Sequence, residues 1–236
     1  MSVFLTAEWR KLVLANYAVD PELLRPRLPA GVELDMWNGT CYVSLVGFMF
    51  QNTRLKGIPV PFHTDFEEVN LRFYVKRNLP DGTVRRGVVF IRELVPKAAI
   101  TLVANVIYKE PYATVPMRHS ITNENGQLVV EYGFRLSGEH SFRVGTQTTS
   151  LPMEPGSEAE FITEHYWGYT KLDATTTSEY PVEHPRWEIY PVHQYRINVD
   201  FGKVYGPEFG FLTNEKPVSV MLAEGSEIVV KSGGKI

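Results

Sequence analysis

The chain has 236 residues, of which 44% are hydrophobic, so it is long enough to bury a substantial core. A formal net charge of −3 and the absence of any basic run argue against nucleic-acid binding. The single cysteine, Cys41, excludes an internal disulfide, and the N-terminus lacks a basic start followed by a long apolar stretch. We therefore expect a cytoplasmic protein that does not enter a membrane.

The first part of the chain has the pattern of β-strands interrupted by turns. Residues 9–19 are extended in character and end at Asp20, which can cap a short helix whose first residue is a proline. The strand-like segments 32–37 and 40–50 flank the Asn-Gly dipeptide at 38–39, which is typical of a two-residue turn. The sequence therefore predicts a hairpin here.

The pattern continues as strands to the end of the chain. Residues 66–77 and 83–95 are joined by a turn-rich linker, which predicts a second hairpin, and a short helix is expected at 157–164. An Asn-Gly dipeptide at 125–126 predicts a further turn between two strands. The later strand-like segments are 113–121, 127–136, 141–149, 165–172, 175–182, 187–197, 218–224 and 227–230.

We find no internal repeat and no linker between domains, so residues 1–236 are expected to form a single domain. Many strands with only two or three helices predict a mainly β (α+β) fold, as a β-rich barrel or a sandwich. The chain lacks a glycine-rich phosphate loop, a nucleophile elbow and zinc-type cysteine pairs, and its histidines are not at metal-ligand spacing. The sequence therefore predicts no metal and no cofactor.

A helical pattern begins directly after the strand that ends at residue 95, at Pro96 and Lys97. The apolar residues at helical spacing are Ala98, Leu102, Val103, Val106 and Ile107. A lysine at the first turn lies at the positive end of the helix dipole, which disfavours a positive charge. Lys97 is therefore either a solvated surface charge or a group with a function.

Four segments resemble the YqjF-like family, which belongs to the acetoacetate decarboxylase-like superfamily. They are FEEVNLRFYV (66–75), GVVFIRELVP (87–96), IYKEPY (107–112) and EHPRWEIYPV (183–192), and the resemblance extends from about residue 6 to about residue 200. It implies a closed or cone-like antiparallel β-barrel around a small-molecule cavity.

The chain is also similar to the decarboxylases of this superfamily. Their early pattern matches Arg10, Tyr17, Asp20, Leu24, Arg25 and Pro29. Their active-site segment, Arg-Glu followed by Pro-Lys-Lys, matches Arg92, Glu93, Pro96 and Lys97, with a gap shorter by two residues and Ala98 in place of the second lysine. The resemblance implies a lysine that forms a Schiff base with a β-keto acid, with Lys97 and Glu93 as the catalytic residues.

Other candidate residues have two interpretations each. Arg10 either pairs with a carboxylate outside its strand or anchors a ligand carboxylate. One of Arg92 and Glu93 should point inward, because neighbouring residues of a strand alternate. A further polar set, which either faces water or lines the pocket, alternates on one strand face and consists of Glu68, Asn70, Arg72 and Tyr74.

Three functions remain open at this point. The first is a protein that binds a small molecule, such as a small organic acid or an oxo compound, in a polar interior pocket. The second is a lysine-dependent decarboxylase-like enzyme acting through Lys97, and the third is a non-catalytic β-rich interaction module. We favour the first, with a small molecule as the partner; the sequence leaves open whether the chain forms homo-oligomers.

Overall fold

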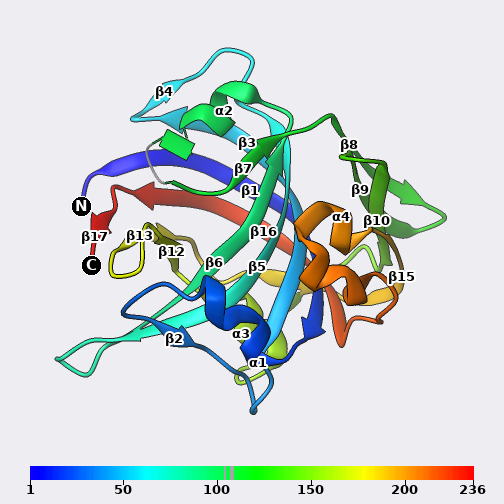
Figure 1. Cartoon of the computed structure of the whole chain (residues 1–236). Helices are drawn as coiled ribbons and strands as arrows, with labels where there is room; N and C mark the ends of the chain where they lie inside the picture. The colour runs from blue at the N-terminus through cyan, green and yellow to red at the C-terminus, as the bar shows by residue number, and fades with distance from the viewer. Residues whose placement is uncertain (104, 107–108) are drawn as a thin grey trace.

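The computed structural model describes residues 1–103, 105–106 and 109–236 and is mainly β, with few and short helices (Figure 1). The strands are β1 (Val3–Ala18), β2 (Glu33–Leu34), β3 (Tyr42–Leu55), β4 (Ile58–Pro59), β5 (Phe66–Asn78), β6 (Val84–Val95), β7 (Tyr112–Thr114), β8 (Met117–Glu124), β9 (Gln127–Arg135), β10 (Glu139–Thr146), β11 (Leu151–Pro152), β12 (Trp167–Lys171), β13 (Thr177–Glu183), β14 (Glu188–Tyr190), β15 (Val192–Asn198), β16 (Ser219–Lys231) and β17 (Gly234–Lys235). The helices are α1 (Pro21–Leu24), η1 (Arg25–Arg27), α2 (Ala98–Val103), α3 (Glu158–Thr163), α4 (Phe201–Tyr205) and η3 (Pro207–Thr213).

The described strands form two sheets. The larger follows the order β11-β14-β16-β1-β3-β5-β6-β12-β13-β17, and β13 also pairs with β16. The seven strands from β16 through β13 are therefore a ring of hydrogen-bonded neighbours. The smaller sheet has the order β15-β10-β9-β8 and lies beside the ring, at the right of Figure 1.

Two strand pairs of the larger sheet are parallel. Trp167 of β12 lies opposite Gly87 of β6, and Tyr112 of β7 lies opposite Glu93 of the same strand. The expectation of a purely antiparallel sheet is therefore wrong at these two pairs. Neither β7 nor β12 follows β6 through a hairpin, and a longer connection allows a strand to return in the parallel direction.

Two of the predicted hairpins are confirmed, and one is wrong. The β5–β6 pair closes at Asn78 and Val84, and the β8–β9 pair closes at Glu124 and Gln127. The Asn-Gly turn at 38–39 closes only a single bridge, because β2 pairs with β5 instead of with β3. The backbone N–H of Asp35 donates to the carbonyl of Tyr74 on β5, at 3.0 Å, which directs this segment away from β3.

The helices that begin at 21 and 158 agree with the prediction. The carboxylate of Asp20 accepts from the backbone N–H of Glu22 at 2.9 Å, so it caps α1 as expected. The predicted principal helix near Pro96 is the six-residue α2, which begins at Ala98 and is no longer than α3. Of the apolar residues expected in it, Ile107 lies outside the described residues.

Strand β5 is buried on both faces. Val69, Leu71 and Phe73 are fully buried in a hydrophobic cluster that also contains Val130 and Tyr132 of β9. This cluster therefore joins the ring to the smaller sheet. The opposite face of β5 carries the polar residues of the sequence pattern and points to a cavity inside the ring.

Candidate functional site

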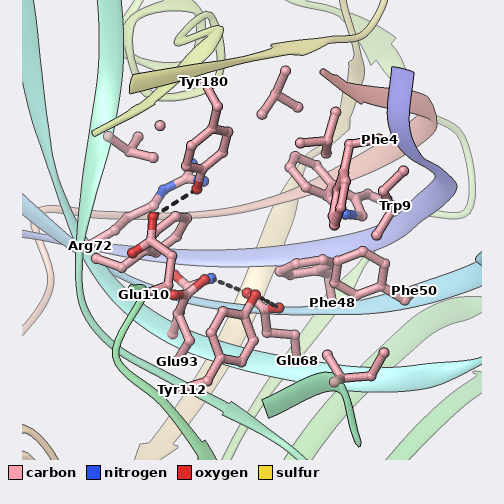
Figure 2. Close-up of a pocket in the computed structure, with 18 of the residues that line it drawn as sticks. Phe4, Trp9, Phe48, Phe50, Glu68, Arg72, Glu93, Glu110, Tyr112 and Tyr180 are labelled. Atoms are coloured by element: carbon pink, nitrogen blue, oxygen red, sulfur yellow. Dashed lines mark hydrogen bonds between the residues drawn. The ribbon is translucent and has the colours of Figure 1, made fainter. Parts of the chain in front are cut away.

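A cavity of about 130 Å³ lies inside the ring of strands. Its polar groups gather on one side, and Phe4, Trp9, Phe48 and Phe50 lie on the other, as Figure 2 shows. The polar and ionisable lining residues are Glu68, Asn70, Arg72, Glu93, Glu110, Tyr112, His165 and Tyr180. The remaining lining residues are Phe4, Leu5, Trp9, Leu12, Phe48, Phe50, Leu55, Phe66, Val88, Phe90, Ile100, Val103, Trp167, Gly168, Val182 and Val230.

Three of the four polar residues predicted on β5 line the cavity. Glu68, Asn70 and Arg72 are 2%, 1% and 8% exposed, and the amide nitrogen of Asn70 donates to Glu68 Oε1 at 2.9 Å. Tyr74 shares this face and is buried, but it does not line the cavity. Its hydroxyl lies 2.7 Å from Ser44 Oγ.

Glu93 enters the cavity from β6 and is 2% exposed. The β5–β6 register shifts between Leu71 and Arg72, so Phe90 and Glu93 both line the cavity although three positions separate them. Arg92 points elsewhere and donates to the carbonyl of Val204 at 2.6 Å. Because of this shift in register, Glu93 points into the cavity and Arg92 points away from it.

Glu110 brings the number of buried carboxyl groups at this end to three, and Tyr112 binds one of them. The hydroxyl of Tyr112 donates to Glu68 Oε2 at 2.8 Å. Glu110 Oε1 accepts from Thr170 Oγ1 at 2.6 Å and from the hydroxyl of Tyr180 at 2.9 Å. Figure 2 shows the three carboxyl groups close together at the polar end.

All three carboxyl groups have raised pKa values. Burial raises the pKa of Glu68 and of Glu110 from an ordinary value of 4.5 to about 7. Burial and then the neighbouring Glu110 and Glu68 raise the pKa of Glu93 well above that ordinary value. Glu93 therefore keeps its proton to a higher pH than an ordinary glutamate does, while Glu68 and Glu110 titrate near neutral pH.

Several buried polar atoms at this end have no hydrogen-bond partner among the described residues. They are Glu93 Oε2, Glu110 Oε2, Asn70 Oδ1 and Arg72 Nε. Buried polar atoms without partners are costly, and they are typical of a site that a ligand or water completes. The cavity thus offers a guanidinium donor, an amide acceptor and two carboxyl oxygens to an occupant.

His165 lines the same cavity, and its imidazole contacts the carboxylate of Asp35. Its Nε2 lies 3.2 Å from Asp35 Oδ2, and the same carboxylate accepts from Arg86 Nε at 2.6 Å. Burial lowers the pKa of His165 from 6.5 to about 4, which keeps the imidazole neutral. Its Nδ1 has no partner among the described residues, so it is a further acceptor near the cavity.

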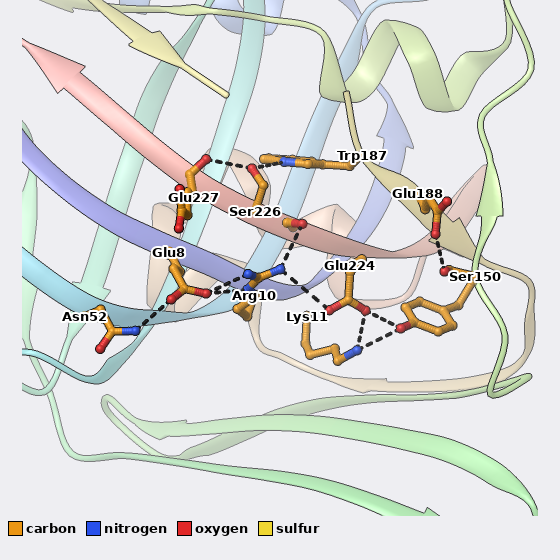
Figure 3. A network of polar contacts seen from close by, with 12 residues as sticks. Glu8, Arg10, Lys11, Asn52, Ser150, Trp187, Glu188, Glu224, Ser226 and Glu227 are labelled. Carbon is orange, nitrogen blue, oxygen red and sulfur yellow. Dashed lines mark hydrogen bonds and ion pairs between the residues drawn. The ribbon is translucent and has the colours of Figure 1, made fainter. Parts of the chain in front are cut away.

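Arg10 does not line the cavity. Its neighbour Trp9 does, and successive side chains of a strand point to opposite faces. Arg10 Nε donates to Glu8 Oε2 at 2.8 Å, and its guanidinium also lies 3.9 Å from Glu224 Oε1, in a partly exposed network shown in Figure 3. Of its two interpretations, Arg10 therefore fits the one in which it pairs with a carboxylate on the outside of its strand.

Lys97 also does not line the cavity. It is partly buried, directly before α2, and Ile100 and Val103 of that helix do reach the lining. No lysine is among the described residues of the lining. The structure therefore does not bring Lys97 together with Glu93, although the two are close in sequence.

Four polar residues of the lining were not identified from the sequence: Glu110, Tyr112, His165 and Tyr180. The first two fall in the segment 107–112 that carries the family resemblance, which was the available signal. His165 lies between α3 and β12 and Tyr180 on β13, and no spacing rule connects these positions to β5.

Within the described residues, no three His, Cys, Asp or Glu side chains are placed to hold a metal ion. The described helices are all too short or too polar to cross a membrane.

Comparison with known proteins identifies a family and a relative in sequence. The profile of the DUF2071 family, described as "Uncharacterized conserved protein (COG2071)", matches residues 6–227. "Uncharacterized protein YqjF" of Bacillus subtilis is 29% identical over 166 residues, which cover 69% of this chain. The match spans 65% of the length of that relative.

Solved structures share the fold at low sequence identity. An acetoacetate decarboxylase from Legionella pneumophila superimposes with a TM-score of 0.69 at 15% identity, over 100% of this chain and 88% of that chain. The enduracididine biosynthesis enzyme MppR, with HEPES buffer bound, gives a TM-score of 0.72 at 13% identity over 100% and 88% of the two chains. MppR in complex with pyruvate gives 0.70 at 12% identity over 100% and 91%.

The sequence therefore places this chain in the DUF2071 family, and its fold is that of the acetoacetate decarboxylase-like proteins.

Proposed function

We propose that the chain binds a small oxo compound or small organic acid in the cavity inside the ring of strands. The observation that carries this proposal is a buried polar end with unpartnered hydrogen-bonding atoms, opposite an aromatic wall. Ligand sites are commonly mostly apolar cavities with a few convergent polar groups. A carbonyl or carboxylate group would lie at the polar end, and the body of the ligand along Trp9, Phe48 and Phe50.

Two donors suit the oxygen of such a ligand. Arg72 carries a permanent positive charge, and its Nε has no partner among the described residues. A terminal nitrogen of the same guanidinium donates to the carbonyl of Ile162, at a long distance of 3.4 Å. Glu93, whose pKa is raised by burial and by its acidic neighbours, supplies an O–H group in its protonated form.

The alternatives have less support. A Schiff-base mechanism needs an amine beside the substrate, and Lys97 does not line the cavity. A non-catalytic interaction module gives no reason for three buried carboxyl groups, whose burial lowers the stability of the fold. The acetoacetate decarboxylase-like neighbours include a protein solved with pyruvate, which is itself an oxo acid.

We also propose that the ring of strand pairs is the closed, cone-like barrel expected from the sequence, within one domain of residues 1–236. The pairing of β13 with β16 supports closure, and the hydrophobic cluster shared by both sheets supports a single domain. A cytoplasmic location fits a chain whose single cysteine, Cys41, is buried as a free thiol.

Titration calorimetry with pyruvate, levulinate and acetophenone tests this function. We expect the wild-type chain to bind at least one of them, and to bind the alcohol 1-phenylethanol more weakly than acetophenone. Replacing Arg72 with Gln should weaken binding about tenfold or more, because a hydrogen bond to a charged group contributes about 1.5–3 kcal/mol.

Arg10→Gln is the matched control. It removes the same guanidinium from β1, where the side chain lies outside the cavity. The proposal fails if none of the three compounds binds, or if Arg10→Gln weakens binding as much as Arg72→Gln.

A further inference from the structure

We propose that the cavity catalyses enolisation of the bound oxo compound, with Glu110 removing a proton from the carbon beside the carbonyl group and Glu93 donating a proton to the carbonyl oxygen. This inference rests on the proposed function, because it needs an oxo compound at the polar end. It assigns to two carboxyl groups an activity that requires no lysine.

Hydrogen bonding distinguishes these two carboxyl groups from the third. Both oxygens of Glu68 accept hydrogen bonds, from Asn70 and from Tyr112. Glu93 and Glu110 each retain one oxygen, Oε2, that is buried without a partner among the described residues. Glu93 and Glu110 are therefore the carboxyl groups free to exchange a proton with a ligand.

Glu110 is suited to be the base. Two hydroxyl donors, from Thr170 and Tyr180, bind its Oε1. Donors to a carboxylate favour its ionised form and fix its orientation, which leaves Oε2 as the reacting atom. Burial raises its pKa to about 7, so the carboxylate is present at neutral pH and is a stronger base than an ordinary glutamate.

Glu93 is suited to be the acid. Burial raises its pKa well above the ordinary value, and the negative charges of Glu110 and Glu68 raise it further. Two titratable groups whose surroundings separate their pKa values divide the roles of acid and base between them. Glu93 and Glu110 line the same cavity, and Figure 2 shows both at its polar end.

The proton movements balance without any other reactant. The C–H bond beside the carbonyl breaks, its proton forms an O–H bond on Glu110, and its electron pair forms the C=C bond of the enol. The carbonyl oxygen takes the proton of Glu93, which becomes a carboxylate. Reversal of these steps after Glu110 exchanges its proton with water returns the ketone with a solvent-derived hydrogen on carbon.

Deuterium exchange followed by proton NMR in D2O tests the inference with the same three compounds: pyruvate, levulinate and acetophenone. Binding is measured in the same samples by saturation transfer. For a compound that binds, we expect the protein to accelerate loss of the signal from the protons beside the carbonyl by about 100-fold or more over buffer. Glu110→Gln and Glu93→Gln should each remove most of this acceleration while the compound still binds.

Glu227→Gln is the matched control, because Glu227 is exposed on β16 and should leave the exchange unchanged. Circular dichroism establishes that the variants fold. If Glu110→Gln does not fold, Tyr180→Phe provides a milder test: it removes one donor to Glu110 and should slow exchange without abolishing binding.

The outcomes separate the two proposals. Binding of a compound without accelerated exchange overturns the enolisation and leaves the proposed function intact. Absence of binding by all three compounds overturns both. Exchange that persists undiminished in Glu110→Gln and Glu93→Gln overturns the assignment of these residues.

Discussion

Asn70 and Glu93 lie directly opposite each other on β5 and β6, and both side chains enter the cavity. Tyr112 lies opposite Glu93 on the other side, on the parallel strand β7. Three neighbouring strands therefore bring an amide, a carboxyl group and a phenol together. Because these polar groups are buried together, the free energy of unfolding should depend on the protonation state of the site.

The first prediction is that stability falls as the pH rises through neutrality. Glu68 and Glu110 have a pKa of about 7 in the folded chain against an ordinary 4.5, so the folded state binds more protons between these values. Their contribution is complete below pH 4.5 and is lost as the pH rises through about 7. We expect a loss of at least about 1 kcal/mol in the free energy of unfolding between about pH 6.5 and about pH 8.

The pH interval is chosen so that the effect of the carboxyl groups on stability can be distinguished from that of His165. The lowered pKa of His165, about 4 against 6.5, acts in the opposite direction, since its contribution is complete well above pH 6.5 and is lost as the pH falls from about 6.5 to about 4. Urea unfolding at several pH values measures the effect. Glu110→Gln should make the dependence shallower, and a wild-type stability that stays constant over the interval would contradict the prediction.

The second prediction concerns Gly168, which lies opposite Tyr180 on the neighbouring strand and lines the cavity. A Cβ atom at Gly168 would lie 2.1 Å from Tyr180 Cζ, so Gly168→Ala must displace the ring whose hydroxyl binds Glu110. We therefore expect calorimetry to find that the oxo compound with the highest affinity for the wild type binds at least tenfold more weakly. A factor of ten corresponds to a loss of about 1.4 kcal/mol in binding free energy.

Gly234→Ala is the control for that substitution, since a Cβ atom there would meet nothing within 4 Å. It should leave binding unchanged. Equal affinities of Gly168→Ala and the wild type would show that the position of the Tyr180 ring is unimportant for the ligand.

The third prediction separates backbone strain from steric conflict at Gly225. Gly225 and Gly57 have almost the same left-handed conformation, with φ of +82° and +81°. A Cβ atom at Gly225 would lie 1.9 Å from the carbonyl oxygen of Trp9, whereas one at Gly57 meets nothing within 4 Å. Alanine at Gly57 should therefore cost only the strain of this conformation, about 1–2 kcal/mol.

Gly225→Ala should cost at least about 2 kcal/mol more than Gly57→Ala, because β1 and β16 must separate locally to admit the methyl group. Thermal or urea unfolding of the two variants measures the difference. Equal destabilisation would mean that the strands adjust freely around Trp9, and that Gly225 is required only for its backbone conformation.

Much of this site could be predicted from the alternation of one strand. The even positions from Glu68 to Arg72 point inward because the odd positions fill the core between the two sheets. The position of Glu93 could not be derived in this way, since a register shift changes which side chains of β6 face the cavity. Glu110 and His165 come from segments outside the strands, so only the folded chain shows that they reach the same space.

The fourth prediction concerns Lys97 and the lysine-dependent mechanism. A lysine open to water is protonated at neutral pH and is a poor nucleophile, whereas a Schiff-base lysine must be enclosed beside its substrate. Lys97 is partly exposed and outside the cavity lining, so an oxo compound bound at the polar end should not contact its amine.

Incubation with pyruvate or acetoacetate, borohydride reduction and peptide mass mapping should therefore give no stoichiometric adduct on Lys97. Calorimetry should likewise find that Lys97→Ala binds the oxo compounds as tightly as the wild type. A full adduct on Lys97 that disappears in Lys97→Ala would instead establish a lysine-dependent enzyme and require α2 to move over the cavity during the reaction.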